Sequence, residues 1–211
     1  MKIITMRPSH RCVLKALLHV MKPKHLIEFG SGPNSTQLLK DAVPHFTSYE
    51  SHPEWVAKMR ADVPGVDIRH LPVNVASFKI YPNKVSLETR KKIYADIQAV
   101  VEDTDVLFVD GYASTRIYTL LAFIDHFGVC VCHDSEKATY WYNKAEKRMA
   151  GYVKLTVMPP ARVPYIDVIF APSHAHLVPA FIAKMQLECL ADYGGYASVM
   201  IKNITATNAA K

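Results

Sequence analysis

Two acids and a histidine lie directly after two strongly apolar segments of the chain. Asp110 follows the apolar segment 106–109, and His133 and Asp134 follow the apolar segment 128–132. Histidine ionises near neutral pH and can accept the proton of a hydroxyl group. Carboxylates, with a histidine or water, can instead hold a hard divalent cation. These residues indicate a site for proton transfer or for a metal ion.

A second group of residues could bind a ligand through the backbone and through carboxylates. Gly30 and Gly32 follow a short apolar run that contains Glu28, and glycine allows the backbone to approach a ligand closely. Glu50 follows the next apolar run, and a carboxylate can accept two hydrogen bonds from a vicinal diol. Two glycines at this spacing fit a nucleotide-binding loop or only a tight turn.

Alternating strands and helices are expected to position both groups. Hydrophobic periodicity predicts strands at residues 25–29, 46–49, 66–71, 106–109 and 128–132, and helices at residues 35–42, 52–61, 87–101, 116–127 and 135–150. Such crossovers build a parallel sheet with helices on both faces. Ligands bind at the carboxyl ends of the strands in such sheets, so both groups should lie at one edge of the sheet.

The pattern changes after residue 150. Segments 152–157 and 165–170 alternate in polarity, and a proline-rich connection between them favours an antiparallel hairpin. A helix at 179–190 and a strand at 196–201 are expected to follow. We therefore expect an α/β fold with a doubly wound, mostly parallel sheet of seven strands and a terminal antiparallel hairpin. Residues 1–211 form a single domain in this interpretation, with an N-terminal helix within 1–26 and a C-terminal addition of a helix and a strand at 172–211.

Composition indicates a globular protein. The 211 residues are 50% hydrophobic and 21% charged, which is enough apolar sequence to bury a core. No apolar run approaches the roughly 18 residues that span a bilayer, and the first residues have no secretory core. We expect a soluble, cytoplasmic protein without a membrane partner. Cys12, Cys130, Cys132 and Cys189 lack disulfide or C-x-x-C spacing and are expected to be buried free thiols.

The net charge of +6 lies at the N-terminus. Residues 1–26 contain six basic residues and no acidic residue, so the rest of the chain has 19 of each sign. Apolar residues between Ser9 and Pro23 recur at helical spacing, and basic residues lie along another face, at Arg11, Lys15, His19 and Lys22. This stripe is either a solvated helix face or a contact for a phosphate-bearing substrate or RNA.

The loop from Glu28 to Gly32, the acid at position 50 and the closing hairpin resemble class I S-adenosylmethionine-dependent methyltransferases over roughly residues 10–171. The resemblance implies a Rossmann-like sheet and S-adenosylmethionine as the cofactor. It places the glycine loop near the methionine part of the cofactor and Glu50 on the ribose hydroxyls. The cofactor-binding residues that it implies are Glu28, Gly30, Ser31, Gly32, Glu50, Ser51, Asn74 and Asp110.

A nicotinamide-dependent dehydrogenase also has an acid after its second strand. In that fold the helix begins at a third glycine of the loop. Here Asn34 stands where the third glycine would be, and segment 33–35 is expected to cap the helix instead. This difference and the hairpin favour the methyltransferase.

Segment 106–135 is also similar to metal-dependent catechol and caffeoyl-coenzyme-A O-methyltransferases. Acids at the ends of the fourth and fifth strands, with an asparagine, hold magnesium in those enzymes. Asp110 and Asp134 match the acids, whereas Ser135 replaces the asparagine. The similarity implies Mg²⁺ at Asp110 and Asp134. Without a metal, His133 or Asp134 would be the base, or Asp110 would orient the substrate.

The resemblance implies O-methylation of a small hydroxylated molecule. Candidate catalytic residues are Asp110, His133 and Asp134, and candidate substrate-binding residues are Tyr112, Arg116, Tyr140 and Trp141. An RNA methyltransferase is an alternative, because Lys24 and Asp110 match two positions of the tetrad of ribose 2′-O-methyltransferases. His133 and Asp134 stand where the tetrad's second lysine is expected. A non-catalytic module that binds the cofactor is the other alternative. The sequence does not indicate an oligomeric state.

Overall fold

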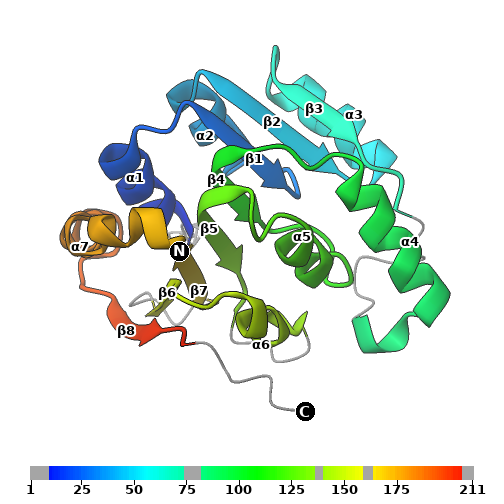
Figure 1. The fold of residues 1–211 in the computed structure, drawn as a ribbon. Helices are drawn as coiled ribbons and strands as arrows, with labels where there is room; N and C mark the ends of the chain where they lie inside the picture. Colours follow the sequence, from blue (N-terminus) through cyan, green and yellow to red (C-terminus); the bar gives the residue numbers. More distant parts are fainter. Residues whose placement is uncertain (1–9, 74–81, 136–139, 159–163, 206–211) are drawn as a thin grey trace, which may run out of the picture.

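A twisted sheet with helices on both faces forms the centre of the molecule (Figure 1). The structure is a computed structural model that describes residues 10–73, 82–135, 140–158 and 164–205. The sheet has eight strands in the order β3-β2-β1-β4-β5-β7-β6-β8. The parallel strands are β1 (His25–Phe29), β2 (His45–Glu50), β3 (Asp67–His70), β4 (Thr104–Val109) and β5 (Phe127–His133). The antiparallel strands are β6 (Val153–Met158), β7 (Ile166–Phe170) and β8 (Ser198–Asn203).

Residue alternation in the central strands produces two cores. Leu107 and Val109 of β4 contact one core, and Val106 and Phe108 contact the other. The first core includes side chains of α4 (Leu87–Gln98), α5 (Arg116–Ala122) and α6 (Tyr142–Ala145). The second includes side chains of α1 (His10–Met21), α2 (Thr36–Ala42) and α7 (Val178–Tyr193). Helix α3 (Pro53–Asp62) packs on β3. The described residues include the 3-10 helices η1 (Pro82–Lys84), η3 (Glu146–Arg148) and η4 (Pro172–Leu177).

The predicted hairpin is confirmed, but the sheet is larger than predicted. Strands β6 and β7 pair antiparallel, and β7 also pairs antiparallel with β5. Strand β8 pairs with β6 along its whole length, from Ser198 opposite Met158 to Asn203 opposite Val153. The expected C-terminal strand therefore extends the sheet to eight strands instead of seven.

Two predicted helices are wrong in extent. Helix α5 ends at Ala122 instead of residue 127, because Phe127 pairs with Thr104 and opens β5. The helix predicted over 135–150 is not continuous in the described residues. There, α6 and η3 together span only residues 142–148, and Asp134 and Trp141 have φ angles of 57° and 62°. These left-handed conformations interrupt a right-handed helix.

Helix α1 is amphipathic, as predicted, but one of its basic residues is engaged by α7. Cys12, Val13 and Leu17 are among its buried residues. The Lys15 Nζ lies 2.8 Å from the Asp192 Oδ1 and also forms a longer ion pair with α7. The charge of Lys15 is therefore partly neutralised within the molecule.

All four cysteines are buried and free, as expected. The Sγ atoms of Cys12 and Cys189 lie 3.0 Å apart between α1 and α7, and those of Cys130 and Cys132 lie 3.7 Å apart on β5. Among the described residues, no helix combines the length and the apolar character that crossing a bilayer requires.

Candidate functional site

One pocket lies at the carboxyl ends of β1, β2 and β4. It has a volume of about 990 Å³. Its lining residues come from the ends of these strands and the loops after them, from α3, from the first residue of α5 and from the segment before α6. They are Gly30, Ser31, Glu50, His52, Glu54, Trp55, Lys58, Asp110, Gly111, Tyr112, Ala113, Arg116 and Tyr140. The pocket thus brings residues of both predicted groups to one edge of the sheet, as the strand-end argument requires.

The loop after β1 needs glycine at one of its two glycine positions. Gly30 has a φ of +97°, and a Cβ atom there would lie 2.4 Å from the Gly111 backbone nitrogen. At Gly32 the nearest atom to an added Cβ would be the Ser35 Oγ, at an ordinary 3.6 Å. The backbone N–H of Asp110 donates to the Phe29 carbonyl at 2.8 Å. The loops after β1 and β4 are therefore in direct backbone contact.

Glu28 lies beneath this loop and is completely buried. Its carboxylate accepts hydrogen bonds from the hydroxyls of Ser35, Thr36 and Ser48 at 2.6, 2.7 and 2.7 Å. Burial raises the pKa of Glu28 to about 7, although the three hydroxyl bonds oppose the shift. Glu28 is not among the residues that line the pocket. Its geometry supports a role in fastening the loop and α2 to the sheet, and its contact with the cofactor stays a prediction.

The expected helix cap within segment 33–35 is wrong. Ser35 has an α-helical backbone and makes no side-chain cap to α2, because its hydroxyl donates to Glu28. The Gly32 N–H instead donates to the Thr36 Oγ1 at 2.9 Å. Asn34, in the position of the missing third glycine, is exposed to solvent.

Glu50 closes β2 and lines the pocket. Its Oε1 accepts the backbone N–H of His52 at 2.9 Å, and its Oε2 accepts the Ser31 hydroxyl at 3.4 Å. Burial raises the pKa of Glu50, while these hydrogen bonds oppose the shift. The Trp55 indole N–H donates to the Ser31 carbonyl at 2.7 Å and fixes this wall of the pocket.

Asp110 and Asp134 lie on either side of the Arg116 guanidinium. The Arg116 Nη2 is 3.1 Å from the Asp110 Oδ1, and its Nη1 is 3.1 Å from the Asp134 Oδ2. The Asp110 Oδ1 also lies 2.8 Å from the His133 Nδ1. These four residues, which we call the charged cluster, come from the ends of β4 and β5 and the first turn of α5. The structure therefore brings together the three predicted catalytic residues.

The surroundings in the charged cluster favour the charged forms of Asp110 and Arg116. Burial alone would raise the pKa of Asp110, but the hydrogen bond with His133 and the charge of Arg116 lower it. Burial would lower the pKa of Arg116, but Tyr142 and the two acids keep it above its ordinary value. Arg116 is only 6% exposed. Its guanidinium pairs with the two acids of the charged cluster and also lies over the ring of Tyr140, in the wall of the pocket.

His10, at the start of α1, was not expected in the site. It is 6% exposed, and neither of its ring nitrogens has a hydrogen-bond partner among the described residues. Its ring centre lies 4.9 Å from that of His133, edge to face. Burial, followed by the charge of His133, lowers the pKa of His10 to about 4, so the ring is neutral at pH 7. His10 stands outside every predicted motif, and only its place on the buried face of α1 could have indicated it.

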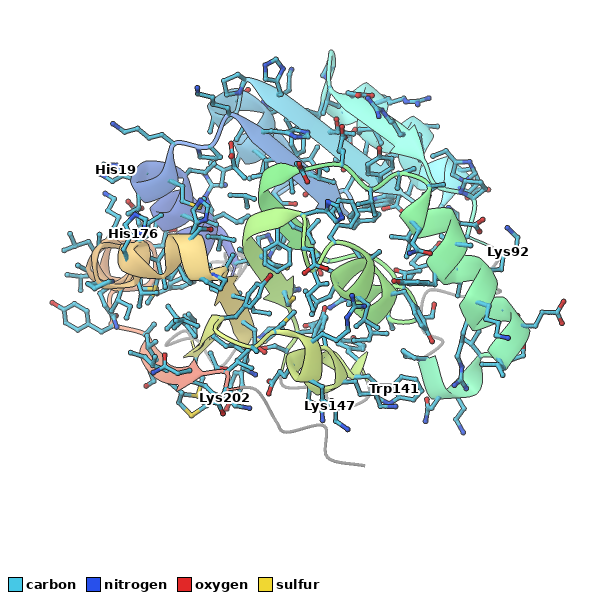
Figure 2. All side chains as sticks on the ribbon, in the orientation of Figure 1. His19, Lys92, Trp141, Lys147, His176 and Lys202 are labelled. Carbon is cyan, nitrogen blue, oxygen red and sulfur yellow. The ribbon has the colours of Figure 1, made fainter. Side chains whose placement is uncertain are left out.

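The remaining predicted residues divide into two groups. Tyr112, Arg116 and Tyr140 line the pocket, and their contact with a substrate stays a prediction. Trp141 does not line it: the Lys144 ammonium lies 3.4 Å from the centre of its ring, and Figure 2 shows Trp141 at the periphery of the molecule. Gly32 and Ser51 are also outside the lining, and Asn74 lies outside the described residues.

The α3 side of the pocket was missed by the sequence interpretation. His52, Glu54, Trp55 and Lys58 line it from the first turns of the helix that follows Glu50. The available signal was position, because a helix that begins directly at a strand end presents its first turns to the same edge of the sheet.

No family model and no curated protein matches the chain. Among solved structures, the fold is similar to that of a methyltransferase-like protein from Silicibacter pomeroyi, with 19% identity, a TM-score of 0.51 and coverage of 86% of this chain and 96% of that chain. It is also similar to the METTL16 methyltransferase domain, with 12% identity, a TM-score of 0.50 and coverage of 82% of this chain and 70% of that chain. At these identities the likeness is one of fold. The chain has the α/β, Rossmann-like fold of methyltransferases.

Proposed function

We propose that this protein is an S-adenosylmethionine-dependent methyltransferase that methylates a hydroxyl group of a small molecule. The observation that carries the proposal is that one pocket joins Glu50 to Asp110. The first residue suits the ribose of the cofactor, and the second belongs to the charged cluster that can act on a hydroxyl group. The methyltransferase fold supports the same assignment.

The cofactor end of the pocket is formed by Gly30, Ser31, Glu50 and Trp55. A carboxylate with two oxygens can accept both hydroxyls of a ribose, and Glu50 already accepts N–H and O–H donors in this position. Gly30 lines this end of the pocket, and its lack of a side chain lets the loop after β4 pack against it. We assign the glycine loop to the methionine part of the cofactor.

The acceptor end contains Asp110, Tyr112 and Tyr140. We assign the base to His133, which is not among the residues that line the pocket but whose Nδ1 lies 2.8 Å from the lining residue Asp110. Such a pair orients the imidazole and stabilises its charged form. As the acceptor oxygen attacks the methyl carbon, its proton passes to His133, and the carbon–sulfur bond breaks with its electron pair left on sulfur. Alignment of oxygen, carbon and sulfur then provides much of the acceleration.

Magnesium at Asp110 and Asp134 is the other form of the proposal. Both residues are at the site, but the Asp134 Oδ2 accepts the Arg116 guanidinium at 3.1 Å and the Tyr140 hydroxyl at 3.4 Å. A magnesium ion would have to compete with these donors, so we favour His133 as the base over magnesium at Asp110 and Asp134.

A small acceptor is also favoured over RNA. The RNA hypothesis depends on the basic face of α1, and Lys15 on that face is paired with Asp192. If RNA is nevertheless the substrate, its affinity should fall steeply with salt and with neutralisation of Arg11.

The test is calorimetric titration with S-adenosylmethionine. We expect binding in the micromolar range, at least about tenfold weaker in Glu50→Ala, because the ribose hydroxyls lose their acceptor. Glu88→Ala, at an exposed position in the first turn of α4, is the matched control and should bind like wild type. Equal binding by wild type and Glu50→Ala would contradict the cofactor assignment.

Methyl transfer is tested next with a panel of phenols, sugars and coenzyme-linked acyl compounds. Transfer that disappears in His133→Ala, with cofactor binding retained, supports the assignment of the base. Cofactor binding without transfer to any of these or to RNA would support the alternative of a non-catalytic binding module.

A further inference from the structure

His10 is a buried polar side chain whose hydrogen-bonding capacity is unused among the described residues. It is 6% exposed, and both ring nitrogens are buried without a hydrogen-bond partner there. The ring packs against Phe108, with centroids 5.4 Å apart, and it also contacts the ring of His133. Buried polar groups of this kind nearly always have a partner, which is protein, water or an ion.

The partner that this geometry fits is a metal ion. His10, Asp110 and His133 each offer a ligand atom, and these atoms lie within 4.8 Å of one another. We propose that these three residues bind a divalent transition-metal ion, of which Zn²⁺ is the type. The ligand set is two imidazoles and one carboxylate, which leaves at least one position open for water or for an oxygen of a bound molecule.

The distances require only side-chain adjustment. Zinc bonds of about 2.0–2.1 Å to nitrogen place neighbouring tetrahedral ligands about 3.4 Å apart. The Asp110 Oδ1 and the His133 Nδ1 lie 2.8 Å apart, which is a hydrogen-bond distance, so this pair must open by about 0.6 Å. The His10 nitrogen, within 4.8 Å of both atoms, must move closer to them, and it then gains the partner that it lacks.

The donor set distinguishes this site from the magnesium site considered above. Magnesium prefers oxygen ligands in octahedral geometry, whereas imidazole nitrogen suits zinc, iron, cobalt and nickel. Asp134 is not in this group of three ligand residues, whereas the magnesium hypothesis requires it. The two hypotheses therefore predict different metals and different sensitive residues.

The charges around the site permit a dication. Asp110 and Asp134 contribute two negative charges and Arg116 one positive charge, within one connected set of contacts. Arg116 donates to the Asp110 oxygen that also contacts His133, so an ion bound through this oxygen must share it with the guanidinium or displace the guanidinium from it.

The site lies next to the pocket, because Asp110 belongs to both. An ion there could bind the acceptor hydroxyl and lower its pKa, which would replace His133 as the means of deprotonation. This consequence rests on the proposed function, but binding of the ion does not.

The experiment measures metal binding by the full chain after treatment with a chelator. Zn²⁺ is titrated by calorimetry, and Co²⁺ is used as a spectroscopic probe whose visible absorption bands report nitrogen and oxygen ligands. We expect binding of one ion per chain and at least a tenfold loss of affinity in His10→Phe, since removal of one ligand typically weakens a site strongly. Phenylalanine keeps the buried ring next to Phe108.

The matched control is His19→Phe on the same helix, where the histidine is exposed (Figure 2). It should bind Zn²⁺ like wild type. Thermal unfolding of the metal-free proteins shows that both variants fold, and Asp110→Asn provides a second ligand variant.

Three outcomes overturn the proposal: no binding of Zn²⁺ or Co²⁺ by wild type, equal binding by wild type and His10→Phe, or binding of Mg²⁺ that depends on Asp134 and not on His10. Cofactor binding is measured in parallel. Loss of the metal result with cofactor binding intact rejects this site alone, whereas metal binding without cofactor binding rejects only the methyltransferase proposal.

Discussion

Two acids at neighbouring strand ends have opposite environments. Glu28 lies on β1 and Asp110 lies just after β4, and these two strands are parallel and paired. Glu28 is completely buried, accepts hydrogen bonds from three neutral hydroxyls of the described residues, and has a pKa raised to about 7. Asp110 is partly exposed to the pocket, contacts Arg116 and His133, and has a lowered pKa.

The difference shows which donors keep a buried carboxylate charged. Hydroxyl hydrogen bonds compensate only part of the cost of removing a carboxylate from water, whereas a cation and an imidazole compensate more. With a pKa of about 7, Glu28 carries less than a full negative charge near pH 7 while it holds the β1 loop. Asp110 lines the pocket, and its lowered pKa favours the anion there.

The largest effect on this comparison should come from Arg116→Met. The change leaves Asp110 and Asp134 buried without their cation, and breaking a buried ion pair costs about 3–5 kcal/mol in the free energy of unfolding. Urea denaturation measures the loss. The control is Arg148→Met, because Arg148 is 51% exposed and lies 3.8 Å from Asp125.

That exposed pair should contribute less than about 1 kcal/mol. Asp110→Asn in the Arg116→Met background should recover part of the stability, since one unpaired charge is removed. Similar losses in Arg116→Met and Arg148→Met would show that Arg116 does not compensate the two acids.

Gly30→Ala tests the backbone contact between the loop after β1, next to Glu28, and the loop after β4, which contains Asp110. Its Cβ would lie 2.4 Å from the Gly111 nitrogen, on a backbone with a φ of +97°, so we expect a loss of at least about 2 kcal/mol and weaker cofactor binding. Gly32→Ala is the matched control and should stay within about 1 kcal/mol, because it meets only the Ser35 Oγ at 3.6 Å. Equal losses at the two positions would mean that loop flexibility, and not this contact, requires glycine.

The sequence was sufficient to predict the fold where local pattern and topology agree. The run at 25–29 is β1 as predicted, and the acids after β4 and β5 meet in one cluster because parallel strands end at the same edge. The helix predicted over 135–150 was wrong, since nothing in its periodicity reveals the left-handed conformations of Asp134 and Trp141.

Side-chain partners were less predictable than positions. Glu28 and Glu50 both match the pattern of acids that the resemblance to methyltransferases implies. Only the three-dimensional structure shows that the Ser48 hydroxyl, from the next strand, donates a hydrogen bond to Glu28. His10 reaches the charged cluster from a helix that lies 100 residues earlier than Asp110, and such a long-range contact has no local signal.

Glu28→Gln gives the smallest effect and the sharpest test of the comparison. The pKa of Glu28 is about 7 in the folded protein and 4.5 for the unperturbed group, so the folded state binds more protons between these values. Its contribution to stability is then fully present below pH 4.5 and is lost as the pH rises toward 7, by up to about 3 kcal/mol.

Glutamine does not titrate, and its altered hydrogen bonding is a cost that does not depend on pH. In urea denaturation at pH 5 and pH 8, the wild type should lose more stability between the two values than Glu28→Gln, by about 1–3 kcal/mol. Glu88→Gln, at an exposed residue of α4, should keep the wild-type difference. If Glu28→Gln also keeps it, Glu28 is ionised in the folded protein, and the hydroxyl donors stabilise its charge as well as Arg116 and His133 stabilise that of Asp110.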